Sequence, residues 1–149
     1  VDTPGADPGF ETEYSGLAAS IGDTFVASLD AKVPVISAVV GEGGSGGALA
    51  IACGDVVGIQ THAVFSVIAP EGAAEILYRD ASRAGEIAPL LRPTSTDLTR
   101  LGLADEVIPE PEGGAHTDPQ AAAAMLKDWL MMHIDSTPNI ENRRTRFRL

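Results

Sequence analysis

Apolar residues recur at two spacings along the chain and predict alternating helices and strands. Between Leu17 and Leu29 a large apolar residue stands at every fourth position, which predicts a helix over about residues 15–30. The segment 33–40 is short and rich in β-branched side chains, which is typical of a buried strand. A helix over 48–53 is expected to follow a glycine-rich loop.

The rest of the chain continues this alternation. The remaining predicted strands are 56–60, 64–68 and 104–108, and the predicted helices are 71–78, 80–91, 94–101 and one that begins at Asp118. Pro70 is expected to open one helix, Thr94 or Ser95 to cap another, and Asp118 with Pro119 to begin the last. Strands alternating with helices make the fold class α/β.

The first ten residues, VDTPGADPGF, have the composition of turns. Val1 and Asp2 are expected to be the last residues of a strand. Because the first residue is not Met, the sequence suggests a fragment, a processed chain or a domain of a longer polypeptide. We divide it into a domain over residues 1–134 and a basic C-terminal tail over 135–149.

Charge is distributed unevenly. The net charge is −11, yet residues 141–149 hold four arginines against one glutamate, so the acidic excess lies in the first 140 residues. An acidic body argues against nucleic acid as the main partner. The arginines, Arg148 among them, are expected either to meet an acidic surface or a phosphate, or to form a solvated terminus.

Neither a membrane span nor a metal site is expected. The apolar stretches are too short to cross a bilayer, and no secretory leader is visible. Cys53 is the single cysteine, which suits a reducing cytoplasm, and its apolar surroundings predict a buried structural thiol. One cysteine and three scattered histidines do not make a zinc site, and His133 is expected to be a core or interface residue.

The glycine-rich loop GEGGSGG, residues 41–47, is the candidate site. It joins a buried strand to a short helix, with Ser45 expected near the helix N-cap. Glycines permit close approach of a backbone to a ligand, and the first amides of a helix have no internal partner. Such a loop suits an anion or an oxyanion.

Several interpretations of this loop remain open. A dinucleotide fingerprint would need an acid about 20 residues later, where Gln60, Thr61 and His62 stand. A nucleophile elbow would use Ser45 with Asp105 and His116, although four residues separate Val40 from the serine. The loop is also compatible with a glycine turn without chemistry. An oxyanion hole would need a second donor, for which the PGADPG turn is the candidate.

Five segments together resemble one family. DTPGADPG, VPVISAVVGEGGSGGALAIACGD, VFSVIAPEGAAEILYRDAS, IPEPEGGAHTDP and the later NRR are similar, in order and spacing, to the acetyl-CoA carboxylase carboxyltransferase alpha subunit. The resemblance spans almost the whole chain and corresponds to the C-terminal half of a family member. It implies a crotonase-like fold, a ββα superhelix, of which this chain is the C-terminal portion.

The resemblance also implies an enzyme and its partners. A family member transfers the carboxyl group from carboxybiotin, presented by a biotin carboxyl carrier protein, to acetyl-CoA, giving malonyl-CoA for fatty acid biosynthesis. A beta subunit or domain with a zinc ribbon supplies the amides that face the thioester. By resemblance, the amides of Gly46 and Gly47 face biotin and Gly5 with Ala6 form the opposite loop. The substrate-binding residues are completed by Gly43, Gly44 and Ser45.

The chain differs from enoyl-CoA hydratases and, in one segment, from the carboxyltransferase family, and these differences leave other functions open. Enoyl-CoA hydratases of the same superfamily use two glutamates, and Leu49 and Ala69 stand at those places, while Glu71 is expected to favour its helix dipole. Residues 11–19, ETEYSGLAA, replace a charged run of the family. A paralogue that carboxylates another acyl-CoA, a fused carboxylase, a biotin-dependent decarboxylase subunit, a serine hydrolase using Ser45 and a non-catalytic assembly scaffold therefore stay open.

Overall fold

A parallel sheet of β1 (Ile36–Val39), β3 (Val56–Gln60) and β5 (Glu106–Ile108) forms the centre of the computed structural model, which describes residues 1–146. The strand order is β1-β3-β5, and the register pairs Val39 with Ile59 and Ile59 with Val107. The strand predicted over 56–60 is present at full length, and those predicted over 33–40, 64–68 and 104–108 are present but shorter. Val1 and Asp2, expected to end a strand, are not part of one. Parallel pairing requires covered faces, which the helices supply.

The glycine loop contributes to a second, smaller sheet that the sequence did not predict. β2 (Glu42–Gly44) pairs in parallel with β4 (Val64–Ser66), so the loop enters its helix from an extended segment. The first residues of the chain run beside it, and Thr3 bridges to Gly43 in the same sense. The turn-rich start and the glycine loop are therefore neighbours in space.

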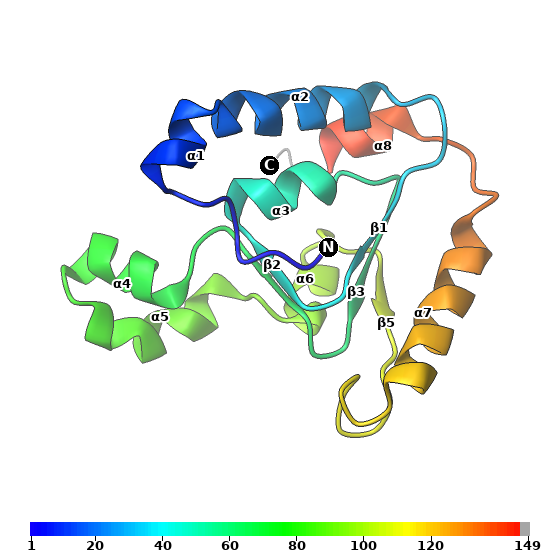
Figure 1. The fold of residues 1–149 in the computed structure, drawn as a ribbon. Coiled ribbons are helices and arrows are strands. Elements are labelled where there is room, and N and C mark those ends of the chain that lie inside the picture. Colours follow the sequence, from blue (N-terminus) through cyan, green and yellow to red (C-terminus); the bar gives the residue numbers. More distant parts are fainter. Residues whose placement is uncertain (147–149) are drawn as a thin grey trace.

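Helices lie on both sides of the central sheet. Figure 1 shows α2 (Leu17–Asp30) above α3 (Ser45–Ile51), and α7 (Pro119–His133) beside β5. A hairpin of α4 (Pro70–Tyr78) and α5 (Ala84–Leu91) projects from the other side. The remaining elements are α1 (Phe10–Tyr14), the 3-10 turn η1 (Ala81–Arg83), α6 (Ser95–Arg100) and α8 (Ile140–Thr145).

The helix starts agree with the turn chemistry of the sequence. Pro70 is the first residue of α4, and the Thr94 hydroxyl accepts a hydrogen bond from the Asp97 amide. The Asp118 carboxylate accepts one from the amide of Ala121 at 2.9 Å. The single helix expected over 80–91 is divided, because Asp80 caps a 3-10 turn before α5 begins.

The core lies between the central sheet and α6. Helix α7 packs on the same sheet, where it approaches Gly58 of β3 closely. The apolar cluster consists of Val39, Ile59, Ala63, Leu98 and Ala104. A Cβ on Gly58 would stand 2.5 Å from the ring of Trp129, so glycine lets α7 approach β3. Trp129 Nε1 donates to Glu106 at 2.7 Å, and the His133 ring lies 4.9 Å from the indole. His133 is thus at a helix–strand contact, as expected.

The C-terminal region is folded against the domain, which corrects the expectation of a solvated terminus for Arg143. This side chain is 1% exposed and donates to Asp55 and to the carbonyl groups of Ser28, Ala31 and Val33. The physical reason is that α8 places it against the carboxyl end of α2. Arg148 lies outside the described residues, and the division at residue 134 stays a prediction.

Cys53 is buried, as its apolar surroundings indicated. It is 3% exposed, and burial raises the pKa of its thiol to about 11, against the opposing charge of Arg146. A thiol with such a pKa is almost entirely protonated at neutral pH and is a poor nucleophile. Within residues 1–146, every helix is too short or too polar to span a lipid bilayer.

Candidate functional site

The glycine loop and the PGADPG turn are joined by a parallel ladder of backbone hydrogen bonds. The Thr3 amide donates to the Glu42 carbonyl at 2.6 Å, and the Gly44 amide donates to the Thr3 carbonyl at 2.8 Å. The turn proposed from the sequence as the opposite loop therefore lies against the glycine loop. This juxtaposition is what a two-loop oxyanion site requires.

Glycines make the contact between the loops close. A Cβ on Gly44 would stand 2.0 Å from the Pro4 carbonyl oxygen, and one on Gly47 would stand 3.1 Å from the Ala6 nitrogen. Gly5 has a φ of 129°, which L side chains rarely adopt, and lies against Gly44 and Ser45. Gly43 is covered by the ring of Phe65. A side chain at Gly44 would therefore separate the loops, and one at Gly47 would press on Ala6.

The start of α3 presents backbone amides without a side-chain cap. Its N-cap is Gly44, which forms no side-chain cap hydrogen bond, and Gly46 is the second helical residue. Amides of the first helical turn have no partner inside the helix and carry partial positive charge. Around the Cβ position of Gly46 no atom lies within 4 Å, so its surroundings are open.

Ser45 departs from the expectation that it caps this helix. Gly44 is the N-cap, and Ser45 is the first helical residue, with a φ of 56° in the left-handed region. The reason is that pairing of β2 with β4 keeps the backbone extended through Gly44. The serine is exposed and its conformation is one that favours glycine.

Two cavities flank the contact between the loops. The first measures about 310 Å³ and is lined by Gly43, Gly44 and Ser45 on one side and by Ile68, Ala69 and Leu91 on the other. The second measures about 410 Å³, lies between α2 and α3, and is lined by Gly5, Ala6, Gly47 and several hydroxyl side chains. Except for Gly46, every candidate site residue borders one of these cavities.

The catalytic pair of a hydratase is not formed. Leu49 lies in α3, and Ala69 is the N-cap of α4 at the wall of the first cavity. Glu71 borders the same cavity from the first turn of α4, where a carboxylate is favoured by the helix dipole.

The hydrolase triad is not assembled either. Asp105 precedes β5, where it accepts hydrogen bonds from Arg146 and from the Val57 amide. His116 follows the other end of β5, and its ring lies near the backbone of Gly114. Neither residue lines a cavity with Ser45. The structure therefore separates the three residues that the sequence motif had connected.

Replacement of Ser45 tests this separation. If the site is catalytic, Ser45→Ala should keep most of its turnover, because the hydroxyl neither caps α3 nor lies in a cavity with Asp105 or His116. Ser45→Gly should raise the free energy of unfolding by up to about 1 kcal/mol, since glycine adopts a left-handed φ without strain. Turnover measurements and thermal melts of both variants check this. Complete loss of turnover in folded Ser45→Ala would restore the nucleophile hypothesis.

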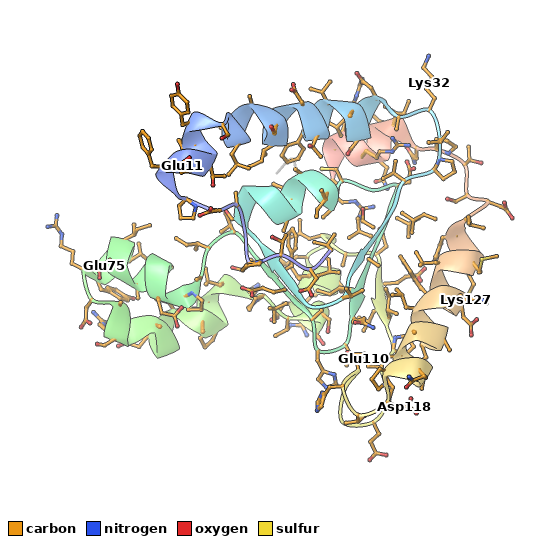
Figure 2. The ribbon with its side chains drawn as sticks, in the orientation of Figure 1. Glu11, Lys32, Glu75, Glu110, Asp118 and Lys127 are labelled. Atoms are coloured by element: carbon orange, nitrogen blue, oxygen red, sulfur yellow. The ribbon has the colours of Figure 1, made fainter. Side chains whose placement is uncertain are left out.

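Sequence reasoning missed two side-chain contacts. The Asp2 carboxylate accepts a hydrogen bond from the Glu42 amide at 3.0 Å, inside the ladder that joins the loops. Glu110, in the segment IPEPEGGAHTDP, accepts from the His62 amide at 2.7 Å and lies 2.6 Å from His62 Nδ1. Figure 2 shows Glu110 in the lower part of the view, as is Asp118 at the start of α7, so this second contact involves the loop that leads to that helix. Neither pair has a spacing that a local motif would reveal.

Metal ligands do not gather in the part of the chain that the structure describes. Among residues 1–146, no group of three or more His, Cys, Asp or Glu side chains is arranged to hold a metal ion. The two loops of the candidate site offer mainly backbone amides and small residues, while the flanking cavities are also lined by apolar, hydroxyl and carboxylate side chains.

Known sequences similar to this chain share one description. A family model described as "Acetyl co-enzyme A carboxylase carboxyltransferase-like" matches residues 1–148. The acetyl-coenzyme A carboxylase carboxyl transferase subunit alpha of Hydrogenovibrio crunogenus is 47% identical over 93% of this chain and 44% of that protein. The corresponding subunits beta/alpha of Salinispora arenicola are 46% identical over 99% of this chain and 27% of that protein. The chain thus spans less than half of each of these two relatives.

Solved structures agree on the fold. Transcarboxylase 12S with methylmalonyl-coenzyme A has a TM-score of 0.71 at 25% identity, over 93% of this chain and 27% of that one. A Pseudomonas malonate decarboxylase hetero-tetramer with coenzyme A has a TM-score of 0.72 at 20% identity, over 96% of this chain and 59% of that one. The α/β fold is crotonase-like, as the resemblance implied.

Proposed function

Because the chain belongs to the acetyl-CoA carboxylase carboxyltransferase family, we propose that it supplies the alpha-type half of a carboxyltransferase active site. The reaction is transfer of the carboxyl group from carboxybiotin to acetyl-CoA, which yields malonyl-CoA for fatty acid biosynthesis. The observation that carries the proposal is the contact of two amide-bearing loops at the Gly44–Pro4 junction.

Backbone amides are suited to this chemistry. Negative charge develops on the ureido oxygen as the carboxyl group departs, and preorganised donors stabilise such charge most when it forms. We assign this role to the amides of Gly46 and Gly47 at the start of α3, with Gly5 and Ala6 on the opposite loop. The arrangement uses no titratable side chain, which agrees with the small residues that form this part of the site.

The cavity beside the loop fits a small bicyclic ring. Its volume of about 310 Å³ and its walls of Ile68, Ala69 and Leu91 suit an apolar ligand, and Gly43, Gly44 and Ser45 stand at its polar edge. When bound, biotin supplies the carboxyl group on its ureido nitrogen. The residues of this chain would orient the ring and exclude water around the reacting atoms.

The proposal includes a protein partner. The amides that face the thioester would come from a beta-type subunit or domain with a zinc ribbon, and a biotin carboxyl carrier protein would present the cofactor. A relative in which both parts are joined supports this arrangement. Apolar side chains of the α4–α5 hairpin are also exposed, with Ile76 at 73%, Leu77 at 66% and Leu90 at 70%. Exposed apolar groups of this kind are typical of surfaces that associate. A cytoplasmic location is part of the same proposal.

A reconstituted transfer assay tests the function. The chain and its beta-type partner are mixed with carboxybiotin and acetyl-CoA, and malonyl-CoA is measured; propionyl-CoA serves as the competing acceptor. We expect malonyl-CoA to form only when both chains are present. Faster carboxylation of propionyl-CoA would reassign the substrate. Transfer at the same rate without this chain would overturn the catalytic role and leave assembly as the alternative.

A further inference from the structure

The Asp2 side chain contacts the glycine loop, although the proposed oxyanion chemistry gives this residue no role. Its Oδ1 accepts a hydrogen bond from the Glu42 amide at 3.0 Å. Glu42 is the first residue of β2, and the glycines that lead into α3 follow it directly. We propose that Asp2 is a positioning residue, which holds the entry of the glycine loop so that the amides of Gly46 and Gly47 are preorganised. The inference rests on the proposed function.

The backbone of the same segment continues this restraint. The Thr3 amide donates to the Glu42 carbonyl at 2.6 Å, and the Thr3 carbonyl accepts from the Gly44 amide at 2.8 Å. Glu42 is therefore held through its N–H by Asp2 and through its C=O by Thr3. Loss of the carboxylate would free the Glu42 amide at the point where the chain turns from β1 into β2.

Gly41 provides the space that the Asp2 carboxylate occupies. A Cβ on Gly41 would stand 2.4 Å from Asp2 Oδ1 and 2.9 Å from its Cγ, and its three nearest atoms all belong to Asp2. Gly41 does not have a left-handed φ, so its backbone tolerates alanine. A methyl group there would displace the Asp2 carboxylate. The absence of a side chain at Gly41 thus leaves the space in which the Asp2 carboxylate reaches the Glu42 amide.

Positioning of this kind acts on turnover more than on binding. The amides of α3 lie a few residues beyond Glu42, and a small displacement of preorganised donors lowers the rate of the chemical step. Asp2 does not approach the Cβ position of Gly46, around which no atom lies within 4 Å. The expected effect is therefore smaller than that of removing an amide itself.

The test is a double-mutant cycle in the assembled carboxyltransferase. We expect Asp2→Ala to lower kcat by about threefold to tenfold, with KM for acetyl-CoA nearly unchanged. Asp2→Asn should restore kcat, since its amide oxygen also accepts the hydrogen bond. Gly41→Ala should lower kcat by a similar factor alone, but should have almost no effect in the Asp2→Ala background. This dependence would show that the two residues act on turnover through one shared contact.

Hydrogen exchange of residues 42–47, measured in the same assemblies, judges the positioning without reference to activity. Exchange should rise in Asp2→Ala and in Gly41→Ala, and return to the wild-type level in Asp2→Asn. Multiplicative losses in the double variant, or unchanged exchange, would overturn the proposal; unchanged melting temperatures exclude global unfolding as the cause. If the wild-type assembly transfers no carboxyl group, the proposed function fails, and the exchange data still decide the role of Asp2.

Discussion

Gly46→Val is expected to lower carboxyl transfer from carboxybiotin by about 100-fold or more while the protein stays folded. The glycine is the second residue of α3, and its Cβ position meets no atom within 4 Å. A valine there would project into the open space at the start of α3, beside the amides that we assign to the biotin oxygen. It would therefore obstruct the ring or turn the amide away without disturbing the chain itself.

Gly85→Val is the matched control for this variant. Gly85 is also the second residue of a helix, α5, and its Cβ position is likewise open. We expect Gly85→Val to retain turnover and both variants to assemble with the beta-type partner. Gly47→Val should also be inactive, but its Cβ would press on Ala6, so it separates the two loops as well. Transfer rates, acetyl-CoA affinity and size-exclusion profiles are the measurements.

The pattern of losses identifies the half of the site involved. Acetyl-CoA affinity should change little in Gly46→Val, because the amides that face the thioester are assigned to the partner. A loss of acetyl-CoA affinity as steep as the loss of turnover would mean that this loop faces the thioester. Near-normal turnover in an assembled Gly46→Val enzyme would show that the oxyanion role is wrong.

Arg143→Ala is expected to lower the free energy of unfolding by about 3–5 kcal/mol, the range for breaking a buried ion pair. The arginine bonds Asp55 through Nε at 2.7 Å and through a terminal nitrogen at 2.9 Å. Its other hydrogen bonds go to the carbonyl groups of residues 28, 31 and 33 at 2.7–2.8 Å. Removal leaves a carboxylate, only 3% exposed, without its cation.

Denaturant unfolding of Arg143→Ala and Arg144→Ala measures this difference. Arg144 also pairs with a carboxylate, that of Asp30, but the two side chains are 49% and 62% exposed. We expect its loss to change the free energy of unfolding by less than about 1 kcal/mol. Arg143→Lys should recover only part of the loss, because an ammonium group lacks the planar fork that contacts both oxygens. Equal effects of the two alanine variants would refute the special role of Arg143.

The same pair predicts how stability depends on pH. Burial alone would raise the pKa of Asp55, but hydrogen bonds from Arg143 and from the amides of Val35 and Asn139 hold that pKa below its usual value. A carboxylate whose pKa is depressed in the folded state contributes stability above its unfolded pKa of about 4. This contribution is lost as the pH falls through the folded pKa, and Arg143→Ala should reduce it.

Local patterns were sufficient for most helices and for the central strands, but not for elements formed by distant contacts. The apolar residues at every fourth position from Leu17 to Leu29 predicted a helix that the structure contains, and so did the helix N-terminus signal Asp118–Pro119. β2 was missed because its Glu-Gly-Gly sequence has low strand propensity, and its pairing with β4 and Thr3 is tertiary. α8 was missed because its arginines resemble a solvated segment.

The candidate site was also predictable only where local sequence patterns indicate it. Glycine composition and position after a strand indicated the loop, and the turn at Gly5 lies against it in the structure, while the role of both stays a prediction. The capping role of Ser45 was wrong, because strand pairing moved the N-cap to Gly44. Asp2 was missed, since its partner is a backbone amide, which leaves no trace in side-chain patterns.

The contacts of Arg143 also determine the order in which this domain can be completed during synthesis. Its partners precede it by 88 residues at Asp55 and by 115 residues at Ser28. A ribosome releases the amino-terminal segments first, so β1 and β3 emerge while the Asp55 carboxylate still lacks its cation. Contacts of such separation raise the contact order and slow folding. The contact between α8 and the start of β3, the central strand, can therefore form only after residue 143 has emerged.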